Sequence, residues 1–171
     1  TTGTGSECTK VAVISRPEHN VKWSVYVNTT MAIVDPELTV TLPHHETATT
    51  GLDALAHATE ALTSKDANVH SDLFAVGAIE KISKYLLTTW NEPDNIEART
   101  QMAIAANWAG MAFADPMCQA GHAIGDALGC NYHTAHGHSC SLGLAEVMRL
   151  VAPAVPEKMA VIAKAMGLDV K

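Results

Sequence analysis

The feature that most limits the fold of this chain is a change in residue type near position 45. Before it, short runs of β-branched residues alternate with turns, and after it alanine-rich windows continue to the end. Alanine favours helices, whereas β-branched residues favour strands. The sequence therefore predicts a mixed α and β fold that is mainly α, with residues 1–45 as one unit and residues 46–171 as an all-helical domain.

Six helices are expected after the boundary, because apolar residues recur there at helical spacing between proline and polar breaks. Ser71 and Asp72 are the expected N-cap of the second helix, and Pro93 fits the first turn of the third. The predicted ranges are 46–64, 71–89, 93–114, 117–129, 138–151 and 155–166.

The first unit is expected to contain short extended segments. Residues 10–15 and 22–27 predict a hairpin, joined by a turn at 17–20. Residues 31–34 predict a short buried strand, which ends where Asp35-Pro36 turns the chain. Residues 38–43 are expected to be extended.

Composition excludes several classes of protein. The chain has 171 residues, of which 47% are hydrophobic and 17% charged, enough for a core in one domain or a little more. Its net charge is −7 and its 11 Lys and Arg are scattered, which argues against nucleic acid and anionic membranes as partners. No apolar run has the length of a membrane span.

The four cysteines form no CxxC pair, so they are interpreted as reduced thiols of a cytoplasmic protein. Buried structural roles are expected for them, although Cys130 and Cys140 could lie near a site. The chain opens on a Gly/Thr loop that is unlike a signal peptide and stops without a docking element. Both ends are therefore expected to be interior to a longer protein.

Two Asp/His pairs stand out in the helical part. Asp53 and His57 are four residues apart, so on a helix both side chains leave the same face. His122 and Asp126 repeat this spacing, and His136 follows after a polar break. We expect two helices and a loop to enclose a metal ion.

Four segments together resemble the iron-containing (group III) alcohol dehydrogenases. They are TTGTGSE at 1–7, AIVDPELT at 32–39, TGLDALAHA at 50–58 and GHAIGDALGCNYHTAHG at 121–137. The resemblance implies that residues 1–45 are the end of a dinucleotide-binding α/β domain and that the helices form the metal-binding domain, the fold shared with dehydroquinate synthase. It also implies the metal ligands Asp53, His57, His122 and His136.

The resemblance further implies the reaction and its cofactors. The metal polarises the oxygen of a small alcohol or aldehyde while hydride moves to or from NAD or NADP. Three imidazoles and a carboxylate suit Fe²⁺, and Zn²⁺, Ni²⁺ or Mn²⁺ remain open. Family members are commonly oligomers, so a homo-oligomer is expected by analogy. The implied cofactor contacts are Thr1, Gly3, Thr4, Ser6 and Thr9 at the pyrophosphate and nicotinamide, Lys22 at the ribose and Thr39 at the adenosine.

Asp126 departs from the family pattern, since many members have a second histidine there. Three roles stay open: a proton relay or polar substrate contact, an additional carboxylate near the metal, or a solvated side chain. His133, His136 and His138 are expected to form a histidine-rich loop at the mouth of the site. The tryptophans Trp23, Trp90 and Trp108 are interpreted as packing residues.

Two other functions are considered. The chain could be a metal-binding helical domain without catalytic activity, since the glycine-rich pyrophosphate loop of the family is missing. A metallohydrolase would need a general base beside an open coordination position, which Asp126 would supply, but the HExxH motif is absent from the sequence.

Overall fold

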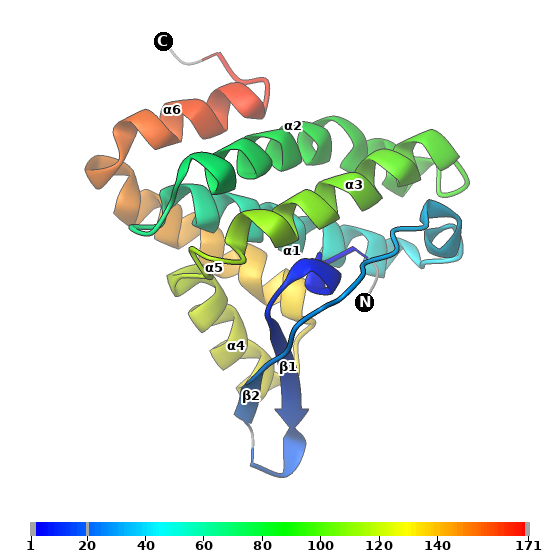
Figure 1. Cartoon of the computed structure of the whole chain (residues 1–171), viewed down its shortest axis with the longest axis horizontal. Helices are drawn as coiled ribbons and strands as arrows, with labels where there is room; N and C mark the ends of the chain where they lie inside the picture. Colours follow the sequence, from blue (N-terminus) through cyan, green and yellow to red (C-terminus); the bar gives the residue numbers. More distant parts are fainter. Residues whose placement is uncertain (1–2, 20, 170–171) are drawn as a thin grey trace.

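The computed structural model describes residues 3–19 and 21–169, and these form a β-hairpin followed by six α-helices (Figure 1). The mainly helical prediction is confirmed. Two short 3₁₀ turns matter below, η1 (Ser6–Cys8) and η3 (Pro36–Thr39). The strands and helices are β1 (Val11–Arg16), β2 (Val21–Tyr26), α1 (His44–Thr63), α2 (Val69–Asn91), α3 (Ile96–Phe113), α4 (Ala120–Tyr132), α5 (His136–Val151) and α6 (Pro156–Ala165).

Alanine side chains let α1, α2 and α3 pack closely around the main core. Small residues shorten the distance between helix axes, because the ridges they form are low. Leu62, Ile79 and Ile82 are at most 1% exposed and fill the remaining space between these helices. The alanines fully buried with them include Ala54, Ala58, Ala75, Ala78, Ala105 and Ala109.

Helices α4 and α5 form a second pair that rests on α1 (Figure 1). Glycines permit the close approach. A Cβ atom on Gly125 of α4 would lie 2.5 Å from the Sγ of Cys140 on α5. A Cβ atom on Gly137 of α5 would lie 1.9 Å from the carbonyl oxygen of Thr49 on α1. These contacts bring three helices, far apart in sequence, to one place.

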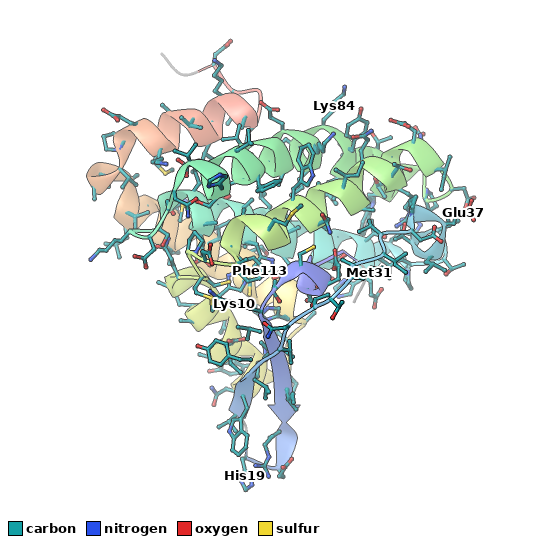
Figure 2. The ribbon with its side chains drawn as sticks, in the orientation of Figure 1. Lys10, His19, Met31, Glu37, Lys84 and Phe113 are labelled. Carbon is teal, nitrogen blue, oxygen red and sulfur yellow. The ribbon has the colours of Figure 1, made fainter. Side chains whose placement is uncertain are left out.

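The hairpin is antiparallel, with Val11 opposite Tyr26, and it projects from the helices with His19 at its tip (Figure 2). Trp23 in β2 is 54% exposed, so the packing role predicted for it is wrong. The guanidinium of Arg16 instead lies 4.5 Å from the centre of its ring. Trp108 packs against the helical core, as predicted.

The extended segments predicted at 31–34 and 38–43 are wrong. Met31 is 76% exposed, and residues 31–34 form no strand. Within residues 3–19 and 21–169 the only sheet is the hairpin, so this apolar run has no strand with which to pair. Asp35 accepts a hydrogen bond from the backbone N–H of Glu37 and thereby starts the turn η3.

Two predicted helix starts shift because asparagine supplies the cap. The side chain of Asn68 accepts hydrogen bonds from the first turn of α2, so this helix starts at Val69. Asn95 caps α3 in the same way. Pro93 therefore lies outside the helix, and its carbonyl accepts a hydrogen bond from Arg99.

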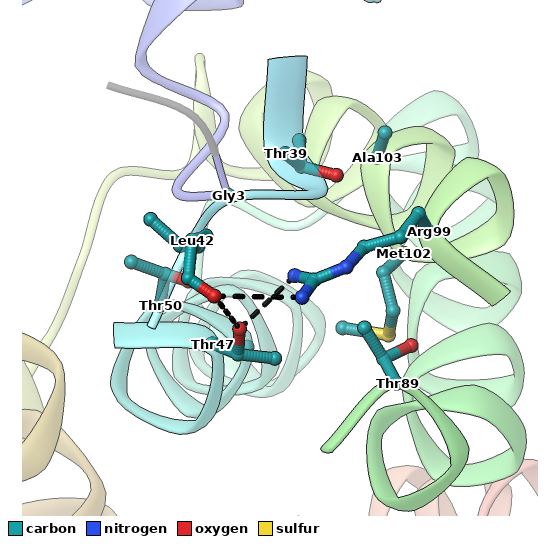
Figure 3. Close-up of a pocket in the computed structure, with 10 residues that line it drawn as sticks. Gly3, Thr39, Leu42, Thr47, Thr50, Thr89, Arg99, Met102 and Ala103 are labelled. Carbon is teal, nitrogen blue, oxygen red and sulfur yellow. Dashed lines mark hydrogen bonds between the residues drawn. The ribbon is translucent and has the colours of Figure 1, made fainter. Parts of the chain in front are cut away.

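Arg99 also ties α3 to the segment that leads into α1 (Figure 3). The buried guanidinium donates hydrogen bonds to Thr47 Oγ1 at 3.0 Å and to the carbonyl of Leu42 at 3.5 Å. This fixes the start of the helix that carries Asp53 and His57. Among the described helices, none is long and apolar enough to cross a membrane.

Candidate metal centre

Three of the four predicted metal ligands, Asp53, His122 and His136, have ligand atoms within 4.8 Å of one another, and His57 lies beside them, 3.9 Å from the second Asp53 oxygen. Asp53 and His57 are 1% and 6% exposed on the inner face of α1. The Nε2 atom of His122, on α4, lies 3.5 Å from Asp53 Oδ1. The Nε2 atom of His136, on α5, lies 3.6 Å from the same oxygen. Three helices therefore bring three imidazoles to Asp53.

Several polar atoms in this cluster are buried without a hydrogen-bond partner. They are Asp53 Oδ1, His57 Nδ1 and His122 Nε2. Leaving a buried polar group unsatisfied costs about 1–3 kcal/mol, so three in one place call for a ligand. A divalent ion bound beside Asp53 would give these atoms a partner, and a carboxylate oxygen with imidazole nitrogens is a donor set that both Fe²⁺ and Zn²⁺ accept. The residues present thus fit a bound metal.

Stacked rings hold His57 in position. Its ring lies 4.1 Å from that of Phe113 and 4.4 Å from that of His122, nearly parallel to both. Phe113, labelled at the centre of Figure 2, closes the site on the side of α3. The stack fixes the planes of two candidate ligands and keeps an apolar wall against them.

Glu60 is a site residue that the sequence reasoning missed. It is fully buried, and its Oε2 lies 2.5 Å from the Nδ1 of His122. The spacing could have revealed it, since it follows His57 by three residues and Asp53 by seven on the same helical face. Two thiols are also neighbours: Cys140, which the sequence analysis considered, and Cys118, which it did not, each lie within 4.8 Å of ligand-capable atoms of this cluster.

The ionisation states of the candidate ligands favour the binding of a cation. Burial lowers the pKa of His57 to about 4 and also lowers that of His136, so both rings are neutral at pH 7. Burial would raise the pKa of Asp53, but the neighbouring imidazoles outweigh it and hold that pKa below its usual value. Burial also opposes charge on His122, but contacts with Asp53 and Glu60 raise its pKa overall. A bound ion would therefore replace a proton at His122.

Asp126 lies on the far side of His136 from Asp53. Its Oδ1 atom is 3.5 Å from His136 Nδ1, whereas the opposite nitrogen of that ring faces Asp53. The ammonium of Lys22, from the hairpin, lies 2.6 Å from the same Asp126 oxygen and 3.1 Å from His136 Nδ1. Asp126 thus forms an ion pair beside the ligand cluster while its side chain stays 44% exposed.

The expected histidine-rich loop is wrong in part. His136 and His138 belong to the first turn of α5, because that helix begins at His136. Only His133, in a left-handed conformation with φ of 56°, lies in the short connection from α4. His133 and His138 are exposed, and neither contributes to the cluster around Asp53.

The residues predicted to contact the cofactor line two different pockets. Thr4, Ser6 and Thr9 line a cavity of about 510 Å³ together with Lys22 and the four candidate ligands. Gly3 and Thr39 line a different, small pocket beside Arg99 (Figure 3). Thr1 lies outside the described residues.

Comparison with known proteins identifies the family. Residues 47–171 match the model of the Fe-containing alcohol dehydrogenase family, C-terminal part. The chain belongs to the iron-containing alcohol dehydrogenase family. Within it, the chain is 40% identical to a choline dehydrogenase of Bacillus subtilis (strain 168), over 99% of this chain and 43% of that protein. It is also 40% identical to the 1-propanol dehydrogenase PduQ of Salmonella typhimurium, over 98% of this chain and 46% of that protein.

Solved structures of the family share the fold. A 1,3-propanediol oxidoreductase superposes on all of this chain and on 46% of its own, with a TM-score of 0.94 and 38% identity. An iron-containing alcohol dehydrogenase from Thermotoga maritima covers 98% of this chain and 46% of its own, with a TM-score of 0.90 and 32% identity. The chain thus spans less than half the length of the iron-containing alcohol dehydrogenases named here.

Proposed function

We propose that this protein is a metal-dependent oxidoreductase that interconverts an alcohol and an aldehyde or ketone with NAD or NADP. The observation that carries the proposal is the set of unpartnered buried atoms on Asp53, His57 and His122, beside a cavity large enough for small ligands. Family membership supports the reaction class. The relatives named above act on choline and 1-propanol, which favours small primary alcohols as substrates.

In this proposal Asp53, His57, His122 and His136 hold the ion, with Fe²⁺ favoured and Zn²⁺ as the other candidate. When bound, the ion polarises the substrate oxygen, and the nicotinamide exchanges hydride with the substrate carbon. The hydroxyls of Thr4, Ser6 and Thr9 would orient the nicotinamide and pyrophosphate, since they line the same cavity.

Other side chains that line the cavity would exclude water and transfer the proton of the alcohol. Phe113 and Met117 give the cavity an apolar wall close to the candidate ligands. Asp126 is the carboxylate at the edge of the cluster, and we assign to it the transfer of the alcohol proton toward solvent. Lys22 forms an ion pair with this carboxylate and would contact the ribose of the cofactor. Gly3 and Thr39 line the separate pocket beside Arg99 and are weaker candidates for cofactor contacts, and Thr1 lies outside the described residues.

Further proposals concern the location of the protein in the cell, its oligomeric state and its domain boundary. We infer a cytoplasmic protein, in keeping with its four free thiols. A homo-oligomer follows only by analogy with the family. The domain boundary at residue 45 also stays a prediction, although α1 begins close to it, at His44.

The proposal is tested by loading the purified chain anaerobically with Fe²⁺ or Zn²⁺ and measuring metal content, NAD(P)H binding and NAD(P)H oxidation by short aldehydes. We expect about one metal per chain, a change in NAD(P)H fluorescence, and aldehyde-dependent oxidation. Metal and cofactor binding without turnover would support the non-catalytic alternative. Absence of metal binding would contradict both.

The substitution Asp126→Asn separates the roles left open for this residue. Because Asp126 faces the outer nitrogen of His136, we expect the variant to keep about one metal per chain while turnover falls roughly 100-fold, the scale of general acid–base catalysis. Metal content is measured by elemental analysis and turnover by NAD(P)H oxidation. Loss of the metal would instead make Asp126 a ligand, and unchanged turnover would remove it from the mechanism.

A further inference from the structure

Glu60 is an ionisable side chain with no solvent exposure, and the imidazole of His122 is its only basic partner among the described residues. Among residues 3–19 and 21–169, no Lys or Arg lies within ion-pair distance of its carboxylate. A buried charge is costly unless it is paired and hydrogen-bonded. The contacts that Glu60 makes should therefore reveal why it is there.

All of those contacts lie at the start of α4. The Nδ1 of His122 lies 2.5 Å from Oε2, the backbone N–H of Gly121 donates to Oε1 at 2.6 Å, and that of Gln119 donates to Oε2 at 3.2 Å. Helix α4 has no cap from its own side chains and no acidic residue in its first turn. Glu60 thus supplies from α1 the acceptors and the negative charge that a helix N-terminus needs.

The contact with His122 also determines which nitrogen of that ring can bind a metal. A carboxylate accepts hydrogen bonds, so the Nδ1 of His122 carries a proton, and Nε2 is the nitrogen whose lone pair a metal can take. Nε2 is the atom that faces Asp53 at 3.5 Å and lacks a hydrogen-bond partner. One carboxylate therefore fixes both the tautomer and the direction of this ring.

We infer that Glu60 is a positioning residue, which anchors α4 to α1 and holds His122 with Nε2 directed at the metal. The inference rests on the proposed metal-dependent function and deepens it, since it identifies what assembles a centre built from separate helices. Gly121 belongs to the same arrangement. A Cβ atom there would lie 2.6 Å from Glu60 Oε1 and would push the carboxylate away.

The test is the substitution Glu60→Gln, with Co²⁺ and Zn²⁺ as probes. An amide keeps the shape but turns one acceptor into a donor, which must then face an N–H of His122 or of the start of α4. We expect the dissociation constants of both metals to rise 10- to 100-fold, the usual cost of losing such a partner. The visible absorption of bound Co²⁺ should also shift, because the orientation of one ligand changes.

A matched control and a second variant separate positioning from stability. Thr63→Val removes a buried hydroxyl of the same helix, which donates to the backbone carbonyls of Thr59 and Glu60 but contacts neither the Glu60 carboxylate nor a candidate ligand. This control should keep the affinity and the Co²⁺ spectrum of the wild type. Gly121→Ala leaves the charge of Glu60 intact but displaces its carboxylate, so it should weaken metal binding in the same direction.

Three results would overturn the inference. The first is that Glu60→Gln and Gly121→Ala bind metal within about twofold of the wild type with an unchanged Co²⁺ spectrum. The second is that Thr63→Val loses as much affinity as Glu60→Gln, which would assign the effect to general destabilisation. The third is a wild-type chain that binds no metal, which would also refute the proposed function, whereas the first two leave that function standing.

Discussion

Replacing Asp53 by asparagine should abolish metal binding while the chain stays folded. Among residues 3–19 and 21–169, Asp53 supplies the only carboxylate oxygen within 4.0 Å of both His122 and His136, and this Oδ1 atom has no hydrogen-bond partner there. The amide has nearly the same shape but lacks the charge that attracts a divalent ion. We expect the dissociation constant for Fe²⁺ or Zn²⁺ to rise by more than about 100-fold, beyond the loss typical of outer-shell partners.

The melting temperature measures this loss directly. At a metal concentration 100 times the dissociation constant, binding adds about 2.7 kcal/mol to the free energy of unfolding. For a chain of this size that raises the melting temperature by roughly 5–10 °C. The wild type should show this rise and Asp53→Asn should not. As a control, Asp66→Asn changes an exposed aspartate just after α1 and should melt like the wild type with metal. A metal-dependent rise retained in Asp53→Asn would contradict the assignment of this ligand.

Replacing Gly137 by alanine should damage the centre without touching any ligand. The added Cβ atom would lie 1.9 Å from the carbonyl oxygen of Thr49 and 3.0 Å from Asp53 Cβ, so α5 must move away from α1. Overpacking of this kind costs about 1–3 kcal/mol, and more where backbone must shift. Because Gly137 follows His136, the movement also carries that imidazole away from Asp53. We expect lower stability toward urea together with weaker metal binding.

Gly129→Ala provides the matched control for this substitution. Gly129 also lies within a helix, α4, but a Cβ atom there would meet nothing closer than 3.6 Å. Alanine is favoured over glycine in helices by about 0.5–1 kcal/mol. This variant should therefore be slightly more stable than the wild type. If both variants change stability equally, the close contact between α5 and α1 is not the cause.

The two variants probe different parts of one arrangement. Asp53→Asn removes charge and leaves the packing, whereas Gly137→Ala leaves every ligand and changes the packing. If both lose the metal, the centre depends on helix contact as much as on its donors. Such dependence follows from its construction, because α1, α4 and α5 each contribute part of the ligand set.

The local elements and the candidate ligands could be predicted from the sequence. Alanine-rich windows specify helices by intrinsic propensity, and the four-residue step from Asp53 to His57 places both on one helical face whatever surrounds them. Spacing also singled out His122 and His136, the family resemblance assigned all four as ligands, and the family itself is shown by the match over residues 47–171. These predictions depend on residues close together in the sequence or on sequence motifs of the family. They could therefore be made without knowledge of tertiary contacts.

The tertiary structure decided what depends on segments distant in sequence. Residues 31–34 have the composition of a strand but find no partner, because strand formation requires pairing. The ion pair between Asp126 and Lys22, 104 residues earlier, could not be predicted from the sequence. Glu60 resembled one more polar residue on a helix until α4 brought three N–H donors to it. A buried carboxylate takes its function from what surrounds it, and that is determined only by how the helices pack.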